Sequence, residues 1–204
     1  MADRTGVLLE SNAAADPFEQ FRRWFAEAEA AAIRAPHAMT LATAGPDGVP
    51  SARMVLLKGA DADGFVFFTG YGSRKGGELE ANPHAALLFY WDPLGRQVRV
   101  EGPVERVSVD ESDAYFAARP RAAQLAAAAS RQGRVLANRA ELDAAMTELE
   151  RAHADGDVPR PEHWGGFRVR PDAYEFWQHR EDRLHDRLRY RRDSDAWVLE
   201  RLSP

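Results

Sequence analysis

Short segments of alternating apolar and polar residues, separated by tight turns, recur along most of this chain. Two of the turns are Gly-Pro-Asp-Gly at residues 45–48 and Asp-Ala-Asp-Gly at residues 61–64. Such segments between Gly, Pro and Asp clusters are typical of antiparallel strands. The pattern predicts strands over residues 37–44, 52–58, 65–69, 84–91, 97–107, 167–169, 174–177, 187–191 and 196–202. Many short strands joined by tight turns favour an antiparallel barrel over a parallel sheet.

Helical patterns are confined to the start and the middle of the chain. Asp16 before Pro17 is a typical helix start, and Phe18, Phe21 and Phe25 follow at helical spacing, so a helix is expected to about residue 34. Further helices are predicted over residues 73–79, 110–118, 124–131 and 140–154. The expected fold class is therefore α+β, an antiparallel barrel with flanking helices.

Length and composition fit one domain. The chain has 204 residues, 45% of them hydrophobic, and no Pro-, Gly- or Ser-rich linker divides it. We therefore expect a single domain over residues 16–204. Residues 1–15 lack hydrophobic periodicity and are predicted to form a mobile N-terminal arm.

Charge and cysteine content argue against several classes of protein. A net charge of −5 is unusual for a general nucleic-acid binder. The chain has no cysteine, which excludes disulfides, thiolate catalysis and Cys-based metal sites. The histidines show no metal-ligand spacing, and no segment has the apolar length of a signal peptide or a membrane span. We expect a soluble cytoplasmic protein without a bound metal.

The basic residues are almost all arginine. Of 27 Lys and Arg residues only Lys58 and Lys75 are lysine, so these two are candidates for sites that need a compact point charge, with chance survival as the alternative. Lys75 follows Ser73 and Arg74 where a strand ends and a helix begins. Amides at a helix N-terminus attract anions, and cations there oppose the helix dipole unless an anion is bound. The pattern predicts a phosphate site, with a solvated basic turn as the alternative.

Two further groups of polar residues could contact an anion. On the strand over residues 52–58, Arg53 and Lys58 point to opposite faces. They could serve two ligands or one ligand lying along the strand end, and two charges that flank a buried strand are the alternative. Tyr115 and Arg119 lie four residues apart on a predicted helix and share a face. A phenol beside a guanidinium suits a phosphate, and an ordinary helix end is the alternative.

Another group of polar residues lies near the C-terminus. Arg183, His185 and Arg187 alternate along the chain, and on a strand all three would share one face. Like charges on one face repel each other, which makes sense if that face meets an anionic ligand. Between two arginines His185 is expected to be neutral more often than charged, and it could then accept or relay a proton.

Together and in this order, these groups resemble the pyridoxamine 5′-phosphate oxidase family. The resemblance covers about residues 16–204 and rests on RMVLLK at 53–58, FFT…GSRK at 67–75, RQVRVEG at 96–102, YFAARPR at 115–121, WGGFRV at 164–169 and EFWQ…RLHDR at 175–187. It implies an antiparallel split β-barrel that binds FMN at the interface of a homodimer. The expected partners are a small phosphorylated ring substrate, O2 and a second copy of the chain, with no nucleic acid and no membrane.

The resemblance also implies roles for single residues, by matching motif. The implied FMN contacts are Arg53, Lys58, Phe68, Thr69, Arg74, Lys75, Gln97, Gln132, Trp177 and Arg187. The implied substrate contacts are Lys58, Tyr115, Arg119, Arg183 and His185, the last two being the catalytic pair.

The implied reaction is FMN-dependent oxidation of pyridoxine or pyridoxamine 5′-phosphate to pyridoxal 5′-phosphate, with O2 reduced to H2O2. The chain departs from the family pattern at Ala123 and Gly133, where serines are usual, and in its N-terminal arm. Two alternatives therefore stay open. One is a related flavin oxidase acting on another ring, such as a dihydrophenazine carboxylate. The other is a non-catalytic carrier of flavin or pyridoxal phosphate.

Overall fold

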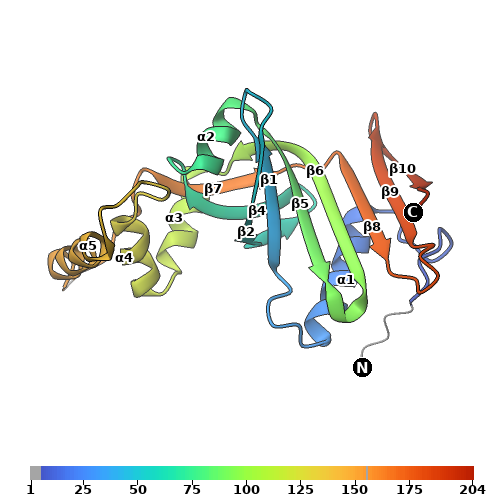
Figure 1. Ribbon diagram of the computed structural model, residues 1–204, viewed down its shortest axis with the longest axis horizontal. Helices are drawn as coiled ribbons and strands as arrows, with labels where there is room; N and C mark the ends of the chain where they lie inside the picture. Colours follow the sequence, from blue (N-terminus) through green and yellow to red (C-terminus); the bar gives the residue numbers. More distant parts are fainter. Residues whose placement is uncertain (1–5, 155) are drawn as a thin grey trace.

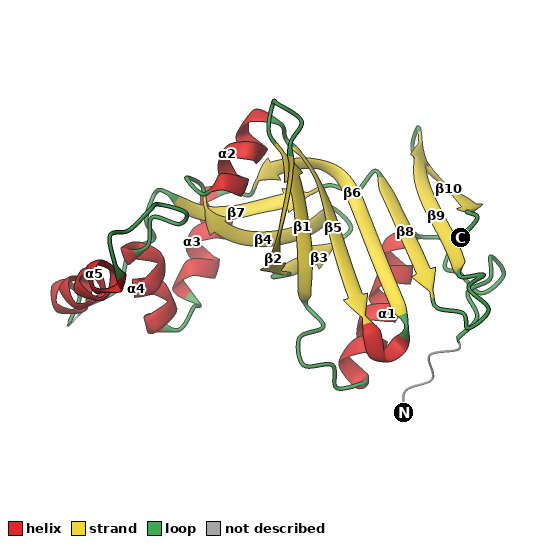
Figure 2. Cartoon of the chain, in the orientation of Figure 1, coloured by secondary structure: helices red, strands yellow, loops and turns green. Residues whose placement is uncertain are grey.

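A computed structural model describes residues 6–154 and 156–204. In this part of the chain one curved antiparallel sheet runs through the molecule, with helices packed beside it (Figures 1 and 2). The strands are β1 (Ala38–Ala44), β2 (Pro50–Leu56), β3 (Gly59–Asp61), β4 (Gly64–Gly70), β5 (His84–Trp91), β6 (Arg96–Arg106), β7 (Trp164–Val169), β8 (Ala173–Gln178), β9 (Asp186–Asp193) and β10 (Ala196–Arg201). The helices are α1 (Pro17–Ala30), α2 (Arg74–Ala81), α3 (Val109–Ala117), α4 (Arg121–Ala129), α5 (Arg139–Ala152) and the short 3-10 helix η1 (Asp92–Leu94).

The sheet folds into a split barrel because β6 changes partner along its length. Residues 96–101 of β6 pair with β8, and residues 104–106 pair with β7. Gly102 lies at the change, where a Cβ atom would collide with the carbonyl oxygen of Arg170. The main strand order is β10-β9-β8-β6-β5-β1-β2, and β7, β4 and β3 continue from β6 as a second wall. Strands β2 and β9 are thus far apart in the sheet.

Helix α1 fills the barrel with aromatic side chains. Asp16 caps the helix with its side chain. Phe21 is 1% exposed, and its ring lies edge-on to that of Phe65 at a centroid distance of 4.8 Å and 5.2 Å from that of Phe89. Burying one such side chain contributes about 1.5–3 kcal/mol, so α1 is an integral part of the core.

Helices α3, α4 and α5 form a lobe beside the barrel (Figure 1). A second hydrophobic cluster holds this lobe together, with Phe116, Leu125, Val158 and Trp164 buried. Because Trp164 is the first residue of β7, the cluster also ties the lobe to the sheet.

The α+β class and the antiparallel sheet are confirmed, and the predicted strands all form, with ends that shift by three residues or fewer. The prediction missed β3, a short strand that pairs with β4. Helix α1 ends at Ala30, not near residue 34, and Ala32 has a left-handed φ of 53°, which a helix cannot continue through. Within residues 6–154 and 156–204, no helix combines the length and the apolar character needed to cross a membrane.

The structure corrects the predicted mobile arm for residues 6–15, which are docked on the C-terminal strands. Leu8 is 4% exposed; its amide donates to Asp186 at 3.3 Å, and its carbonyl accepts from Arg201 at 2.9 Å. Glu10 also pairs with Arg201, and this hydrogen bond lowers the pKa of Glu10 to about 2. These partners lie so far away in the chain that local periodicity could not indicate them. Residues 1–5, the rest of the predicted arm, lie outside the described residues.

Candidate functional site

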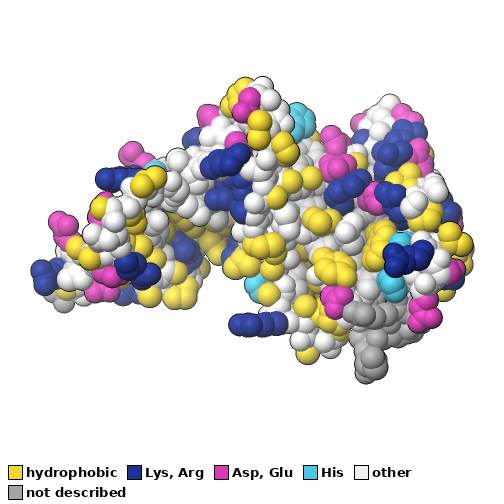
Figure 3. All heavy atoms as spheres, in the orientation of Figure 1, with side chains coloured by type: hydrophobic (Ala, Val, Ile, Leu, Met, Phe, Trp, Pro, Cys, Tyr) yellow, Lys and Arg dark blue, Asp and Glu magenta, His cyan; other side chains and the backbone are white. Residues whose placement is uncertain are grey.

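A cavity of about 810 Å³ opens between β2, β4, the start of α2 and the lobe of α3 and α4. Five cationic side chains line it, and they are Arg53, Lys58, Arg74, Lys75 and Arg119. No carboxylate of the described residues lines this cavity. Figure 3 shows basic side chains gathered beside α2. A concave surface with an excess of positive charge concentrates anions, so the cavity suits phosphorylated ligands.

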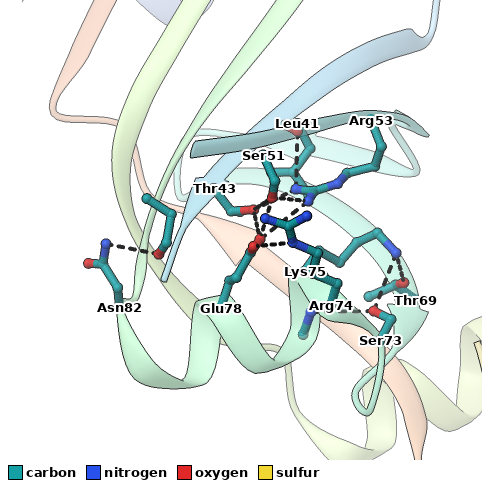
Figure 4. A network of polar contacts seen from close by, with 12 residues as sticks. Leu41, Thr43, Ser51, Arg53, Thr69, Ser73, Arg74, Lys75, Glu78 and Asn82 are labelled. Atoms are coloured by element: carbon teal, nitrogen blue, oxygen red, sulfur yellow. Dashed lines mark hydrogen bonds and ion pairs between the residues drawn. The ribbon is translucent and has the colours of Figure 1, made fainter. Parts of the chain in front are cut away.

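The start of α2 places Lys75 in the wall of the cavity. Figure 4 shows its side chain directed at Thr69 and Ser73. Ser73 caps the helix with its hydroxyl. Lys75 is 8% exposed, and its Nζ donates to the hydroxyls of Thr69 at 3.2 Å and Ser73 at 3.3 Å. Burial, followed by the neighbouring charge of Arg53, lowers the pKa of Lys75. A buried ammonium with hydroxyl partners gains strongly from an added anion.

Glu78 does not line the cavity, and it accepts hydrogen bonds from β1, β2 and its own helix (Figure 4). Its Oε2 accepts from the hydroxyls of Thr43 at 2.5 Å and Ser51 at 2.6 Å. The same oxygen accepts from Nη2 of Arg53 at 3.2 Å, and Oε1 accepts from Nε of Arg74 at 2.8 Å. These bonds, that of Ser51 foremost, lower the pKa of Glu78 to about 2, so its carboxylate is ionised at neutral pH.

Glu78 should contribute to the acid sensitivity of the fold. Its pKa of about 2 in the folded protein is below the ordinary value of 4.5, so its carboxylate stabilises the fold above about pH 4.5 and loses this effect as the pH falls toward 2. We expect the Tm of the wild-type protein to fall more steeply from about pH 5 to about pH 2.5 than the Tm of Glu78→Gln. Circular dichroism during thermal unfolding measures both slopes, and equal slopes would contradict the expectation.

Stacked aromatic rings form another wall of the cavity. The ring of Phe68 lies 3.9 Å from that of Tyr115 and 5.5 Å from that of Trp164, centroid to centroid and nearly parallel. The guanidinium of Arg119 lies over Trp164 at 4.6 Å, a cation–π contact. Its Nη1 is buried and has no hydrogen-bond partner in the described part of the chain, and burial lowers the pKa of Arg119. A buried, unpaired donor of this kind suits an incoming anion.

Gln132 reaches the cavity from the loop after α4. Its Oε1 accepts from the hydroxyl of Thr69 at 2.8 Å and from the amide of Gly70 at 3.3 Å. The side chain is therefore oriented with its carbonyl inward, and its NH2 group is the part that can donate to a ligand. Ala123 and Gly133 line the same cavity, so two of the departures from the family pattern lie within the site.

Other predicted contacts lie elsewhere in the sheet. Gln97 on β6, Trp177 on β8 and Arg187 on β9 are register partners and form a row across three strands. Arg187 donates to the buried carboxylate of Glu175 at 2.8 Å. Strands β1 and β5 separate this row from Arg53 on β2, and none of the three row residues lines the cavity. One chain alone does not bring the two groups together.

The prediction that Arg183, His185 and Arg187 share one strand face is wrong. Arg183 has a φ of 66° and lies with His185 in the loop before β9, where strand alternation does not apply. Nδ1 of His185 accepts a hydrogen bond from the amide of Arg180 at 3.0 Å, so the proton of the neutral ring is on Nε2. The ring lies 4.6 Å from that of Trp177, which places His185 beside the row.

Two protein-family models match different parts of this chain. Residues 25–152, which include most of the cavity wall, match the model described as pyridoxamine 5′-phosphate oxidase. Residues 164–204, which include β8 and β9, match the model described as the pyridoxine 5′-phosphate oxidase C-terminal dimerisation region. The chain belongs to the pyridoxamine 5′-phosphate oxidase family. The family indicated by the sequence motifs is thereby confirmed.

Members of the family resemble this chain over nearly its whole length. A protein of Rubrobacter xylanophilus named pyridoxine/pyridoxamine 5′-phosphate oxidase is 59% identical over 197 residues, which cover 97% of this chain and 91% of that protein. A Thermosynechococcus vestitus protein of the same name is 59% identical and covers 97% and 93%. The crystal structure of PhzG from Burkholderia lata 383 in complex with tetrahydrophenazine-1-carboxylic acid has a TM-score of 0.93 at 34% identity, covering 98% of this chain and 100% of that one.

The sequence assigned no role to Glu78, or to Glu175 and Trp164, although the last two lie within quoted motifs. Glu78 follows Arg74 by four residues on a helix, a spacing that could have indicated their ion pair. Trp164 meets Arg119 only because the lobe packs on β7, and no local signal reports that contact.

Proposed function

We propose that this member of the family is an FMN-dependent oxidase. Its reaction is the oxidation of pyridoxine or pyridoxamine 5′-phosphate to pyridoxal 5′-phosphate, with O2 reduced to H2O2. Relatives of that name at 59% identity over 197 residues support the assignment. The observation that carries it is the convergence of five cations on one cavity whose described lining holds no carboxylate.

The start of α2 suits the phosphate of FMN. Arg74 and Lys75 lie in the first turn of this helix, and Arg53 approaches from β2. Amide groups at a helix start add to their charge. The ammonium of Lys75 is buried and donates to the hydroxyls of Thr69 and Ser73, so a phosphate would complete its hydrogen bonds. The other proposed FMN contacts in this cavity are Lys58, Phe68, Thr69 and Gln132.

The aromatic wall suits the phosphate of the substrate. Lys58, Tyr115 and Arg119 line the cavity together, and the unpaired Nη1 of Arg119 fits an anionic oxygen. Lys, Tyr and Arg can bind a phosphate ester without the serine that is usual at position 123. The site therefore has cations for two phosphates, one on the cofactor and one on the substrate.

The remaining contacts are proposed to come from a second copy of the chain. Gln97, Trp177 and Arg187 would face the flavin bound in the partner's cavity, since their own chain holds them away from it. A two-fold dimer lets each chain contribute its cavity to one site and its row to the other. The match of residues 164–204 to a dimerisation region supports this arrangement.

When bound, the flavin supplies the redox step by accepting a hydride from the substrate and passing electrons to O2. The chain's own residues bind and orient. Arg183 would hold the substrate ring over the flavin, where orientation sets the rate. His185 carries its proton on Nε2 and would donate a hydrogen bond to the substrate ring.

The homodimer is testable by light scattering. We expect the FMN-bound protein to have twice the chain mass of 22.7 kDa. The physical reason is that neither the cavity nor the row is a complete site. A monodisperse monomer that oxidises substrate would contradict the proposal.

Restoring a hydroxyl at position 123 should improve substrate binding. One neutral hydrogen bond is worth about 0.5–1.5 kcal/mol, so Ala123→Ser should lower the KM for pyridoxine 5′-phosphate roughly threefold to tenfold. Ala127→Ser, also on α4 but outside this cavity, is the matched control and should leave KM unchanged. Oxygen uptake by the FMN-loaded enzyme measures both.

The same oxygen-uptake assay tests the function against its alternatives. The 34% identity to PhzG over 98% of the chain makes a dihydrophenazine carboxylate the specific competitor. Faster uptake with that ring than with either phosphate, together with no effect of Ala123→Ser, would favour a PhzG-like oxidase. Flavin binding without uptake on any of the three substrates would favour a carrier.

A further inference from the structure

Glu78 is the only carboxylate that the described residues bring to Arg53 and Arg74. It lies in the second turn of α2 with its side chain 10% exposed. It does not line the cavity. It contacts both arginines, as Figure 4 shows. A buried carboxylate with four partners holds those partners in fixed positions.

The two arginines depend on Glu78 to different degrees. Arg53 also donates to the carbonyl of Leu41 and to the hydroxyls of Thr43 and Ser51, so several acceptors fix its guanidinium. Arg74 has a side chain that is 66% exposed, and among the described residues its ion pair with Glu78 is what orients it. Free arginine side chains have high rotamer entropy, so losing this contact would release Arg74 first.

We propose that Glu78 is a positioning residue for the phosphate of FMN. It joins one arginine from β2 to one from α2, so both guanidiniums are in place before the ligand arrives. This inference rests on the proposed function, because it needs FMN in the cavity. Glu78 acts through Arg53 and Arg74 and does not touch the ligand itself.

The negative charge of Glu78 is compatible with a phosphate nearby. Arg53, Arg74 and Lys75 carry three positive charges, and Glu78 reduces the sum to two. A phosphate monoester carries about −1.5 to −2 at pH 7, so the cluster and the ligand nearly cancel. Both arginines line the cavity whereas Glu78 does not, so it is their positive charges that would meet the phosphate directly.

Glu78→Gln tests this role, because it keeps the size of the side chain and removes its charge. We expect the Kd of the full-length FMN-free protein for FMN to rise about tenfold, the cost of ordering one long side chain again on binding. The Kd for riboflavin, which lacks the phosphate, should not change. Fluorescence quenching measures both ligands, and the 31P chemical shift of bound FMN should move in the variant.

Glu80→Gln is the matched control. Glu80 lies on the same helix and pairs with Arg106 at 2.8 Å on the exposed side, away from the cavity. The control variant should bind FMN and riboflavin as the wild type does. If it weakens FMN binding as much as Glu78→Gln, the effect is a general one of charge on α2 and the inference is overturned.

Thr43→Val keeps the inference testable if Glu78→Gln fails to fold. Thr43 bonds Glu78 and Arg53 but does not line the cavity, so its loss can affect FMN only through them. We expect a smaller, about threefold, rise in the Kd for FMN and none for riboflavin. An unchanged Kd for FMN in both variants overturns the inference and leaves the proposed function intact. A wild-type protein that binds no FMN overturns both.

Discussion

Replacing Lys75 with methionine should weaken FMN binding by about 1.5–3 kcal/mol, or roughly tenfold to 150-fold in Kd. The same change should raise the Tm of the FMN-free protein. Lys75 is 8% exposed, and it donates to two hydroxyls. Keeping its charged amine buried therefore destabilises the FMN-free fold, and a bound anion offsets that destabilisation. Methionine has a similar length and no charge, so it removes both this destabilisation and the contact to the phosphate of FMN.

Two thermal unfolding curves, with and without FMN, measure both effects of Lys75→Met. Because burial lowers the pKa of Lys75, the gain in Tm should shrink as the pH rises and the folded wild-type amine loses its proton. Lys58→Met is the control, since Lys58 is exposed and its loss should leave the Tm of the FMN-free protein nearly unchanged. A lower Tm for Lys75→Met with FMN affinity unchanged would contradict the proposed site.

Replacing Phe21 with alanine should destabilise the protein by about 3–5 kcal/mol. Its ring is 1% exposed and lies against those of Phe65 and Phe89, so the variant leaves a cavity that the barrel cannot readily close. For a chain of this size the Tm should fall by roughly 6–20 °C. Differential scanning calorimetry measures the change.

Phe25→Ala is the matched control for Phe21→Ala. Phe25 lies one turn later on α1 and is only partly buried, so its loss should cost clearly less. Neither residue lines the proposed cofactor cavity, and the Kd for FMN of the folded variants should stay at the wild-type value. Equal losses of stability in the two variants would show that α1 is not anchored mainly through Phe21.

The parts of the fold that the sequence predicted are those set by neighbouring residues. Strand alternation and turn residues are local, and so is the cap that Ser73 provides for α2. The same holds for the cavity's two lysines, which stand out by residue type, and for its three arginines, which the motifs indicate. Whether these residues contact FMN and substrate stays a prediction that the binding experiments above would test.

The parts that the sequence did not predict depend on distant segments. The docking of Leu8 needs Asp186 and Arg201 at the other end of the chain. Glu78 gains its role from Thr43 and Ser51, which the sheet brings to it from β1 and β2. The alternation of charges over residues 183–187 resembled a strand, but strand geometry begins only at the start of β9, after a residue with positive φ.

Strand β2 also bears on solubility. It ends the sheet, pairing with β1 alone among the described strands, and Met54 and Leu56 on it are 63% and 42% exposed. An open edge with apolar side chains can template aggregation, and proteins usually blunt such edges with lysine or proline. Here Pro50 blunts only the start of the strand, and Arg53, which follows it, lines the cavity. If a second copy covers this edge, dissociation on dilution should expose an aggregation-prone strand at the moment activity is lost.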